Sequence, residues 1–272
     1  MIPLVIAEEK LATELSLAVE RHALSLVFQP KIEIATGRLT GVEALARWDH
    51  PALGAIGPST FVSLAERFGS IDALTDWVIA AALRQWIDWR EQGVETNLAF
   101  NISALTLRDV HFPDHLDRMC RIQGVPLDRI TLEVTEGATQ HAVRLLDTLT
   151  RFRIKGIGVS LDDFGTGYSS LLQLRQLPYS ELKIDQCFVL DALRSRESRL
   201  IIQAMVGLAH GLGLTATAEG VEDAETLALL ASLGCDHGQG FFIAHPMRGT
   251  ELVPWMIDRS AERAEHQTAR AA

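Results

Sequence analysis

Residues 24–48, LSLVFQPKIEIATGRLTGVEALARW, contain two apolar runs, Leu24–Gln29 and Leu39–Leu45, that are typical of β-strands. About nine residues, with Thr36 and Gly37 at their centre, connect the two runs. This connection is too short for the helical crossover that joins parallel strands. We therefore expect the two strands to form an antiparallel hairpin.

Six further strands are predicted along the chain: Asn97–Ile102, Ile130–Val134, Ile157–Leu161, Glu181–Ile184, Leu214–Ala218 and Gly240–Ile243. Four segments have the apolar spacing of amphipathic helices: Ile71–Arg90, Ala138–Phe152, Arg199–Gly211 and Ala224–Leu233. Eight strands alternating with helices indicate an α/β fold that closes into a TIM-type (β/α)8 barrel. Because of the hairpin, we expect a modified barrel with one antiparallel strand. An open doubly wound sheet is the alternative.

The composition is that of a globular protein, with 47% hydrophobic and 22% charged residues among 272. This excludes a disordered chain, a collagen and a disulfide scaffold. The formal net charge of −10 disfavours binding to a nucleic-acid polymer, because an extended phosphate backbone is repelled. The three cysteines, Cys120, Cys187 and Cys235, are widely spaced and form no paired-thiol motif, which is typical of a reducing compartment.

The N-terminus shows no signal peptide, because its short apolar run is followed by Glu8 and Glu9. Charges or glycines interrupt every apolar stretch well before the roughly 20 residues that a membrane-spanning helix needs. We expect a cytoplasmic protein that does not bind a membrane. Its predicted organisation is a helical lead-in over residues 1–22, one folded domain over residues 23–258, and a polar tail over residues 259–272.

Polar residues stand at or near the ends of the predicted strands: Glu43, Asn101, Glu133, Asp162, Asp163, Lys183 and Glu219. In a β/α barrel the carboxyl ends of the strands converge on one face. Converging carboxylates repel one another, and a divalent cation relieves that cost. Carboxylate and amide oxygens suit Mg²⁺ or Mn²⁺, and two such ions would polarise a phosphoryl group and activate water. Where the strand ends, Asp162 and Asp163 can both turn toward one centre, and Arg47 and Lys183 supply local cations.

Several motifs occur in one order along the chain: FQP from Phe28, VEALARW from Val42, NIS from Asn101, LEVTE from Leu132, SLDDFGTGYSSL from Ser160, LKID from Leu182, AEGVE from Ala218 and QGFF from Gln239. Together they closely resemble the EAL-domain phosphodiesterases, which hydrolyse the bacterial second messenger cyclic di-GMP. The resemblance extends from about Ala23 to Leu252. It implies the EAL version of the modified barrel and a product that is linear 5′-pGpG.

The resemblance also implies roles for individual residues. Two Mg²⁺ or Mn²⁺ ions per active site would be held by Glu43, Asn101, Glu133, Asp162, Asp163 and Glu219. Lys183 would contact the attacking water or an intervening ligand, and Glu219 would help to accept its proton, so Glu43, Lys183 and Glu219 are the expected catalytic residues. The substrate pocket would be lined by Gln29, Leu45, Arg47, Glu222 and Gln239. Glu136 would anchor the loop that follows Asp163.

Three positions depart from the family pattern: Gly137 replaces a serine, Lys31 an aliphatic residue and Cys187 a small hydroxyl residue. None of them removes an expected metal ligand. A homodimer is expected from the loop after Asp163 and from an adjoining apolar helix that carries Leu171, Leu172, Leu174 and Leu177. Neither a cyclase nor a sensor module is expected in this chain. The alternative functions are a cyclic di-GMP receptor without catalysis and a different metal-dependent barrel hydrolase.

Overall fold

The computed structural model describes residues 2–136, 142–165 and 171–260. The strands are β1 (Ser25–Glu33), β2 (Leu39–His50), β3 (Gly54–Ile56), β4 (Asn97–Asn101), β5 (Ile130–Thr135), β6 (Gly158–Phe164), β7 (Glu181–Ile184), β8 (Thr215–Ala218) and β9 (His237–Gln239). The helices are α1 (Ile2–Glu20), α2 (Pro58–Phe68), α3 (Ile71–Glu91), α4 (Phe112–Gln123), α5 (Ala142–Ile154), α6 (Leu171–Gln176), α7 (Gln186–Asp191), α8 (Arg196–Gly211) and α9 (Ala224–Ser232). Residues 252–260 are also helical.

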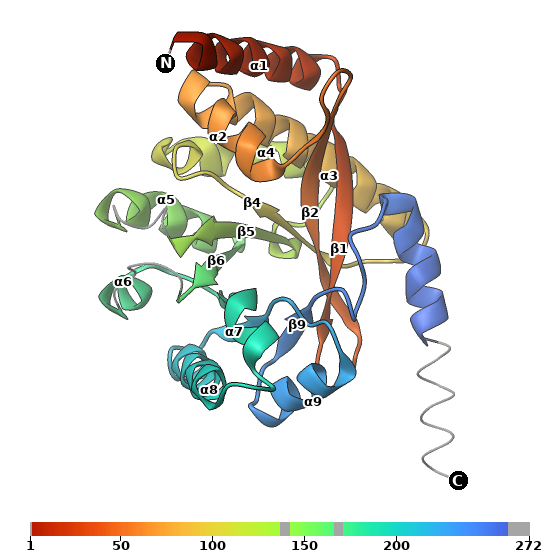
Figure 1. Cartoon of the computed structure of the whole chain (residues 1–272), viewed down its shortest axis with the longest axis vertical. Coiled ribbons are helices and arrows are strands. Elements are labelled where there is room, and N and C mark those ends of the chain that lie inside the picture. Colours follow the sequence, from red (N-terminus) through yellow and green to blue (C-terminus); the bar gives the residue numbers. More distant parts are fainter. Residues whose placement is uncertain (1, 137–141, 166–170, 261–272) are drawn as a thin grey trace.

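The strands close into a barrel in the order β1-β9-β8-β7-β6-β5-β4-β2, and β1 pairs with β2 to complete the ring (Figure 1). Strand β1 is antiparallel to both of its neighbours, whereas the pairings from β2 through β4 to β9 are parallel. The short β3 pairs only with β2, outside the ring. The predicted modified barrel with one antiparallel strand is therefore confirmed, and the open doubly wound sheet is excluded.

The hairpin that opens the barrel has the expected antiparallel register, with Gln29 opposite Glu43 and Lys31 opposite Gly41. The last predicted strand was wrong. It is His237–Gln239, whereas Gly240–Ile243 forms a turn in which the Gly240 carbonyl accepts hydrogen bonds from the Ile243 and Ala244 amides. The aromatic run after Gly240 imitates a buried strand, but both phenylalanines in it are about half exposed.

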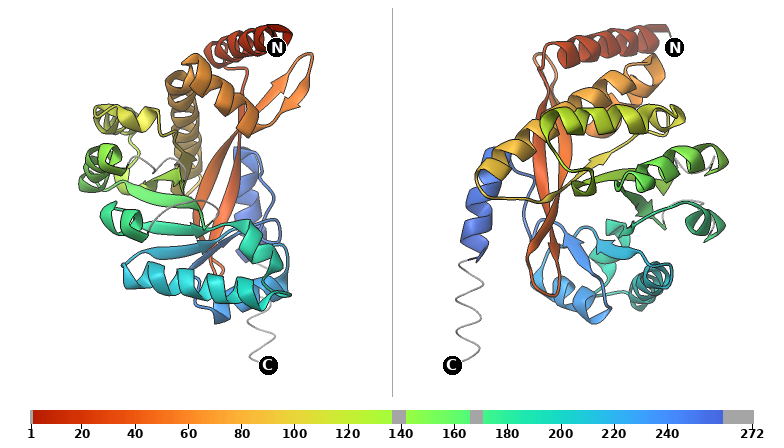
Figure 2. Two further views of the ribbon diagram at one scale, coloured as in Figure 1. Left: turned by 60° about the vertical axis from the view of Figure 1, so that its left-hand side comes forward. Right: turned by 180° about the vertical axis from the view of Figure 1, so that it is seen from behind.

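Most of the core lies between the barrel wall and the surrounding helices, which cover the outer side of the strands (Figure 2). A second apolar cluster joins α1, α2 and the start of α3 to Trp48 at the end of β2. The outer face of β7 carries Leu182 and Ile184, both fully buried in the main core. Because side chains alternate along a strand, Glu181 and Lys183 face the barrel interior. That interior is polar, in contrast to the apolar interior of most β/α barrels.

Several predictions fall partly outside the described residues. Gly137 and Thr166–Ser170 lie there, and so does the start of the helix predicted from Ala138. Of the leucines on which the homodimer prediction was based, Leu174 and Leu177 are buried in the core of this chain. Among the residues that the structure describes, none of the helices is long and apolar enough to span a membrane.

Candidate active site

The ammonium group of Lys183 is the centre of the site at the carboxyl end of the barrel. Its Nζ lies 2.7 Å from Glu219 Oε1, 2.9 Å from Glu133 Oε2, 3.1 Å from Asp162 Oδ1 and 3.7 Å from Glu43 Oε2. The side chain of Lys183 is 1% exposed, so bulk water screens these contacts little. One buried cation therefore faces four carboxylates, and the site carries an excess of negative charge.

Two amides hold Glu43 in place on β2. Asn101 Nδ2 donates to Glu43 Oε1 at 2.7 Å, and Gln239 Nε2 donates to Glu43 Oε2, also at 2.7 Å. Gln239 additionally donates to Gln29 Oε1 at 3.2 Å. The hairpin register explains this group, because it places Gln29 directly opposite Glu43 on the adjacent strand. Glu43 is thereby oriented toward the barrel axis.

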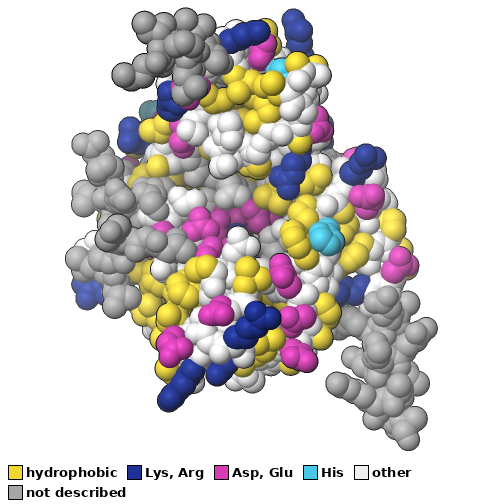
Figure 3. Space-filling view, in the orientation of Figure 1, with side chains coloured by type: hydrophobic (Ala, Val, Ile, Leu, Met, Phe, Trp, Pro, Cys, Tyr) yellow, Lys and Arg dark blue, Asp and Glu magenta, His cyan; other side chains and the backbone are white. Residues whose placement is uncertain are grey.

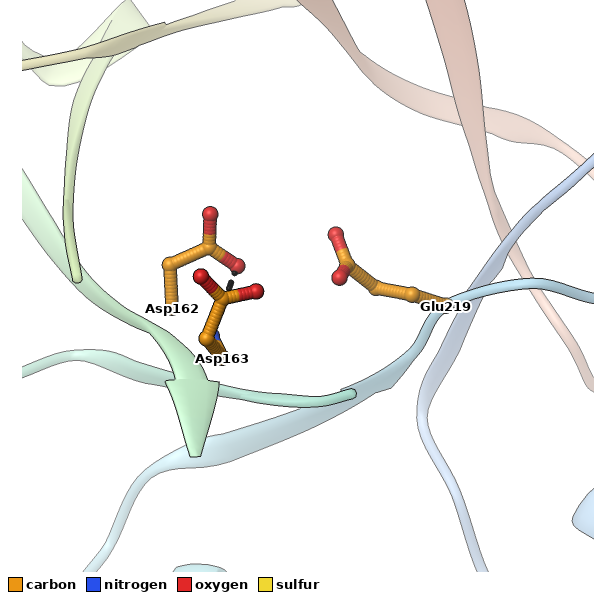
Figure 4. A group of neighbouring side chains, drawn as sticks. All are labelled: Asp162, Asp163 and Glu219. Atoms are coloured by element: carbon orange, nitrogen blue, oxygen red, sulfur yellow. Dashed lines mark hydrogen bonds between the residues drawn. The ribbon is translucent and has the colours of Figure 1, made fainter. Parts of the chain in front are cut away.

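Asp162 and Asp163 lie on the same side of β6 because the strand bulges between Leu161 and Phe164. Asp163 has a backbone φ of 57°, a left-handed conformation that aspartate tolerates better than most residues. Oxygen atoms of Asp162, Asp163 and Glu219 all lie within 4.8 Å of one another, and Figure 4 shows the two aspartates facing Glu219. The two aspartates turn together as expected, but β6 continues to Phe164, so the cause is a bulge and not the end of the strand.

The surplus of carboxylates shifts their pKa values in different directions. Burial and the charge of Glu43 raise the pKa of Glu133 well above its usual range. Burial raises the pKa of Glu219 to about 7, and burial together with the charge of Asp162 raises that of Asp163. Burial opposes ionisation of Glu43 as well, but the charge of Lys183 and the two amide donors lower the pKa of that carboxyl. The charge of Lys183 and the two amide donors thus favour the ionised form of Glu43.

Two cavities flank this cluster. One, of about 310 Å³, is lined by all five residues predicted for the substrate pocket: Gln29, Leu45, Arg47, Glu222 and Gln239. The other, of about 570 Å³, reaches Asn101, Asp162 and Asp163 and is otherwise mostly apolar. Figure 3 shows acidic side chains gathered in the hollow on this face of the molecule.

Both cavities are also lined by residues that no sequence motif had indicated. Phe241 and Pro246 line the smaller cavity, and Ser59, Phe61 and Glu66 line the larger one. Phe241 stacks on His245 with a ring-centroid distance of 4.3 Å and is 53% exposed. An isolated glycine within an apolar run favours an interruption of a strand. Gly240 is the signal that could have placed Phe241 on a loop at the cavity edge.

Glu136 lies next to the cluster and fastens the end of β6. Its Oε2 accepts a hydrogen bond from the Gly165 amide at 3.0 Å, and Glu136 itself is buried. Gly165 has a φ of 100°, and a Cβ there would come within 2.4 Å of Met205 Cε. Only glycine fits this position without displacing its neighbours. The described start of the loop is thus tied to Glu136.

The residues present fit a hard divalent cation, because Asp162, Asp163 and Glu219 offer three neighbouring carboxylate oxygens. Glu43 and Glu133 do not join this triplet but gather around Lys183 and face it from other strands. Asn101 reaches the group through Glu43. The geometry is suited to binding cations beside a bound anion such as a phosphoryl group.

Comparisons with known proteins agree with this geometry. The sequence profile of the EAL domain matches residues 12–246. A cyclic di-GMP phosphodiesterase of Pseudomonas aeruginosa is 41% identical over 248 residues, which cover 90% of this chain and 42% of that protein. The bifunctional diguanylate cyclase/cyclic di-GMP phosphodiesterase MucR of the same organism is 39% identical over 246 residues, which cover 90% of this chain and 36% of MucR.

A solved structure of the PaMucR phosphodiesterase in complex with c-di-GMP superposes with a TM-score of 0.84 at 39% identity, covering 89% of this chain and 99% of the other. The chain thus spans well under half the length of the two curated relatives but nearly all of this solved domain. The profile match covers most of the sequence, and the resemblance read from the motifs is confirmed. The chain belongs to the EAL domain family.

Proposed function

We propose that this chain is a metal-dependent phosphodiesterase that hydrolyses cyclic di-GMP to linear 5′-pGpG. The observation that carries the proposal is the cluster of Glu43, Glu133, Asp162 and Glu219 around Lys183. A receptor that only binds the nucleotide needs no such excess of buried carboxylates, which is costly to fold. The similarity to the cyclic di-GMP phosphodiesterase of Pseudomonas aeruginosa, at 41% identity, supports the same reaction.

The proposed ligands of two Mg²⁺ or Mn²⁺ ions are Glu43, Asn101, Glu133, Asp162, Asp163 and Glu219. When bound, such ions lower the pKa of water and offset the negative charge of phosphoryl oxygens. The protein contributes a rigid arrangement of these ligands, since the side chains come from different strands of the barrel, with Asp162 and Asp163 at the β6 bulge. Amide donors from Asn101 and Gln239 orient Glu43 before any cation arrives.

Lys183 and Glu219 are proposed to act on the attacking water. The ammonium group of Lys183 can hold a water or a phosphoryl oxygen by donating a hydrogen bond. Glu219 has the most exposed side chain among the carboxylates around Lys183, at 19%, and it lines the smaller cavity. It is therefore placed to accept the proton of the water as the ribose 3′ oxygen leaves.

The substrate is proposed to lie across the two cavities, with its reacting phosphate between them. Gln29, Leu45, Arg47, Glu222 and Gln239 would surround one nucleotide half in the smaller cavity. The mostly apolar walls of the larger cavity are suited to the other half, because a purine base presents large apolar faces. Arg47 lines both cavities, and its guanidinium can complement a phosphate there.

The decisive experiment is incubation of the purified chain with cyclic di-GMP in Mg²⁺, in Mn²⁺ and in chelator, with chromatography of the nucleotides and a parallel binding titration. Formation of pGpG that depends on the metal is the expected result. Tight binding without product would instead identify a receptor. Neither binding nor product would show that the carboxylates act on a different phosphate ester.

We also propose that the chain forms a homodimer through the region around α6, as the resemblance to the family implies. Because Leu174 and Leu177 are buried in the chain itself, other residues of this region would form the contact. Light scattering at micromolar concentration should give the mass of a dimer. A monomer with full activity would refute this proposal.

A further inference from the structure

A second buried ion pair lies inside the barrel, and the proposed reaction does not use it. Lys31 Nζ donates to Glu181 Oε1 at 2.6 Å, with side-chain exposures of only 11% and 7%. The hydroxyl of Thr217 donates to the same oxygen. Lys31 was noted in the sequence as a departure from the family pattern, so the structure now gives this residue a partner.

The pair lies one layer below the carboxylate cluster. Glu181 precedes Lys183 by two residues on β7, and Lys31 follows Gln29 by two residues on β1. Residues two apart on a strand share a face, so both members point into the barrel. The cation of this lower layer is therefore stacked beneath the residues that surround Lys183.

A small cavity lies between Lys31 and the cluster. Its volume is about 10 Å³, and its lining includes Lys31, Gly41, Glu43 and Glu133. Lys31 is close enough to Glu133 for its charge to be among the influences that lower the pKa of that carboxyl. Because a lysine carries its charge on a flexible four-carbon stem, its ammonium group could enter this space if nothing held it. At present Glu181 and Lys31 neutralise each other.

We propose that Glu181 is a positioning residue that holds the ammonium of Lys31 away from Glu133 and Glu43 and so keeps both carboxylates available to a divalent cation. The inference rests on the proposed function, because it assumes a cation at the cluster. It gives the ion pair a role beyond stability. A second ammonium beside Glu133 and Glu43 would compete directly with the metal, since like charges repel strongly at short range in a buried site.

The test is calorimetric titration of Mn²⁺ alone into three forms of the full chain: wild type, Glu181→Gln and Lys31→Met/Glu181→Gln. The substitution Glu181→Gln keeps the side-chain shape and frees the charge of Lys31, so Mn²⁺ should bind at least ~10-fold more weakly. Removing that charge as well should restore an affinity within about 3-fold of wild type. Activity of Glu181→Gln should recover at high Mn²⁺, whereas kcat at saturating metal should change little.

The possible outcomes test the proposed function and the positioning role of Glu181 separately. No Mn²⁺ binding by the wild type would refute the proposed function. Wild-type binding with an unchanged affinity in Glu181→Gln would overturn the inference alone. Equal weakening in the single and double variants would also overturn it, because the effect would then not depend on Lys31.

Two further variants provide a milder change at the same ion pair and a matched control. Thr217→Val removes one donor to Glu181 without changing any charge. If Glu181→Gln does not fold, this milder variant should still weaken Mn²⁺ binding about 2-fold to 3-fold. An affinity of Thr217→Val equal to wild type would then count against the proposal. Asp114→Asn is the matched control, because it disrupts an ion pair with Lys155 on the outer surface and should leave the affinity unchanged.

Discussion

The two charged layers of the barrel interior differ in their balance. In the lower layer one cation, Lys31, meets one carboxylate, Glu181, and the charge of Lys31 lowers the pKa of Glu181 to about 2 despite burial. In the upper layer Lys183 alone faces four carboxylates, and burial raises the pKa of Glu219 to about 7. Folding itself neutralises the charges of the buried pair in the lower layer. The surplus negative charge of the upper layer is neutralised only when cations bind from solution.

The largest expected effect concerns the upper layer. Glu43→Ala or Asp162→Ala should lower turnover of cyclic di-GMP by about 100-fold to 1000-fold, because either change removes a charged group at the proposed position of the reacting phosphate. The barrel should remain folded, since each change relieves repulsion among the carboxylates. Product chromatography measures the loss, and circular dichroism checks the fold. Unaltered turnover in either variant would refute the assigned site.

The second prediction separates the layers by stability. Lys31→Met should lower the free energy of unfolding by about 3–5 kcal/mol, because it leaves the Glu181 carboxylate buried without a cation. Lys183→Met should also destabilise the protein in chelator. Mn²⁺ should reduce the loss of unfolding free energy relative to wild type in Lys183→Met but not in Lys31→Met. Added cations can replace a lost charge only in the upper layer. Urea unfolding with and without Mn²⁺ measures both differences, and equal rescue of the two variants would contradict the comparison.

The third prediction concerns the wild type. A ligand that binds only the folded state at 100 times its Kd adds about 2.7 kcal/mol to the stability. Saturating Mn²⁺ should therefore stabilise the wild type by roughly this amount relative to chelator. Asp162→Ala, which lacks one of the three neighbouring carboxylates, should gain much less. Thermal unfolding monitored by circular dichroism makes the comparison, and an equal gain in both would show that Mn²⁺ binds elsewhere.

The smallest effect is a dependence of stability on pH with opposite signs in the two layers. The folded pKa of Glu219, about 7, exceeds its usual value of 4.5, so in chelator its contribution to stability is present below pH 4.5 and is lost as pH rises through 7. Glu181 has a folded pKa of about 2, so its contribution is present above pH 4.5 and is lost as pH falls toward 2.

Urea unfolding from pH 3 to pH 8 should reveal both trends as differences between the wild type and single variants. The difference in unfolding free energy between the wild type and Glu219→Gln should change between pH 5 and pH 8. The corresponding difference for Glu181→Gln should change only below pH 4.5. The same pH window for both variants would remove the distinction between the layers.

Much of the fold followed from local pattern. The short hairpin connection required antiparallel strands, and the alternation of strands and helices implied a barrel. The prediction failed at Gly240–Ile243, where local apolarity imitated a strand. Backbone pairing ends at Gln239, which is opposite Lys31 on β1, and from Gly240 the chain forms a turn instead. Strand β3 was missed, since its three residues lie outside the ring and are mostly exposed.

Strand periodicity and motif order are local properties of the chain, so they indicated which polar side chains lie on or near the strand ends. Which of these side chains meet depends on the closed barrel. Lys31 and Glu181 are 150 residues apart, and the register of the closed barrel brings them together. The same closure places Lys183 among its carboxylates, and the β6 bulge turns Asp162 and Asp163 to one side. Such contacts depend on strand register and stagger, which no local pattern of residues records.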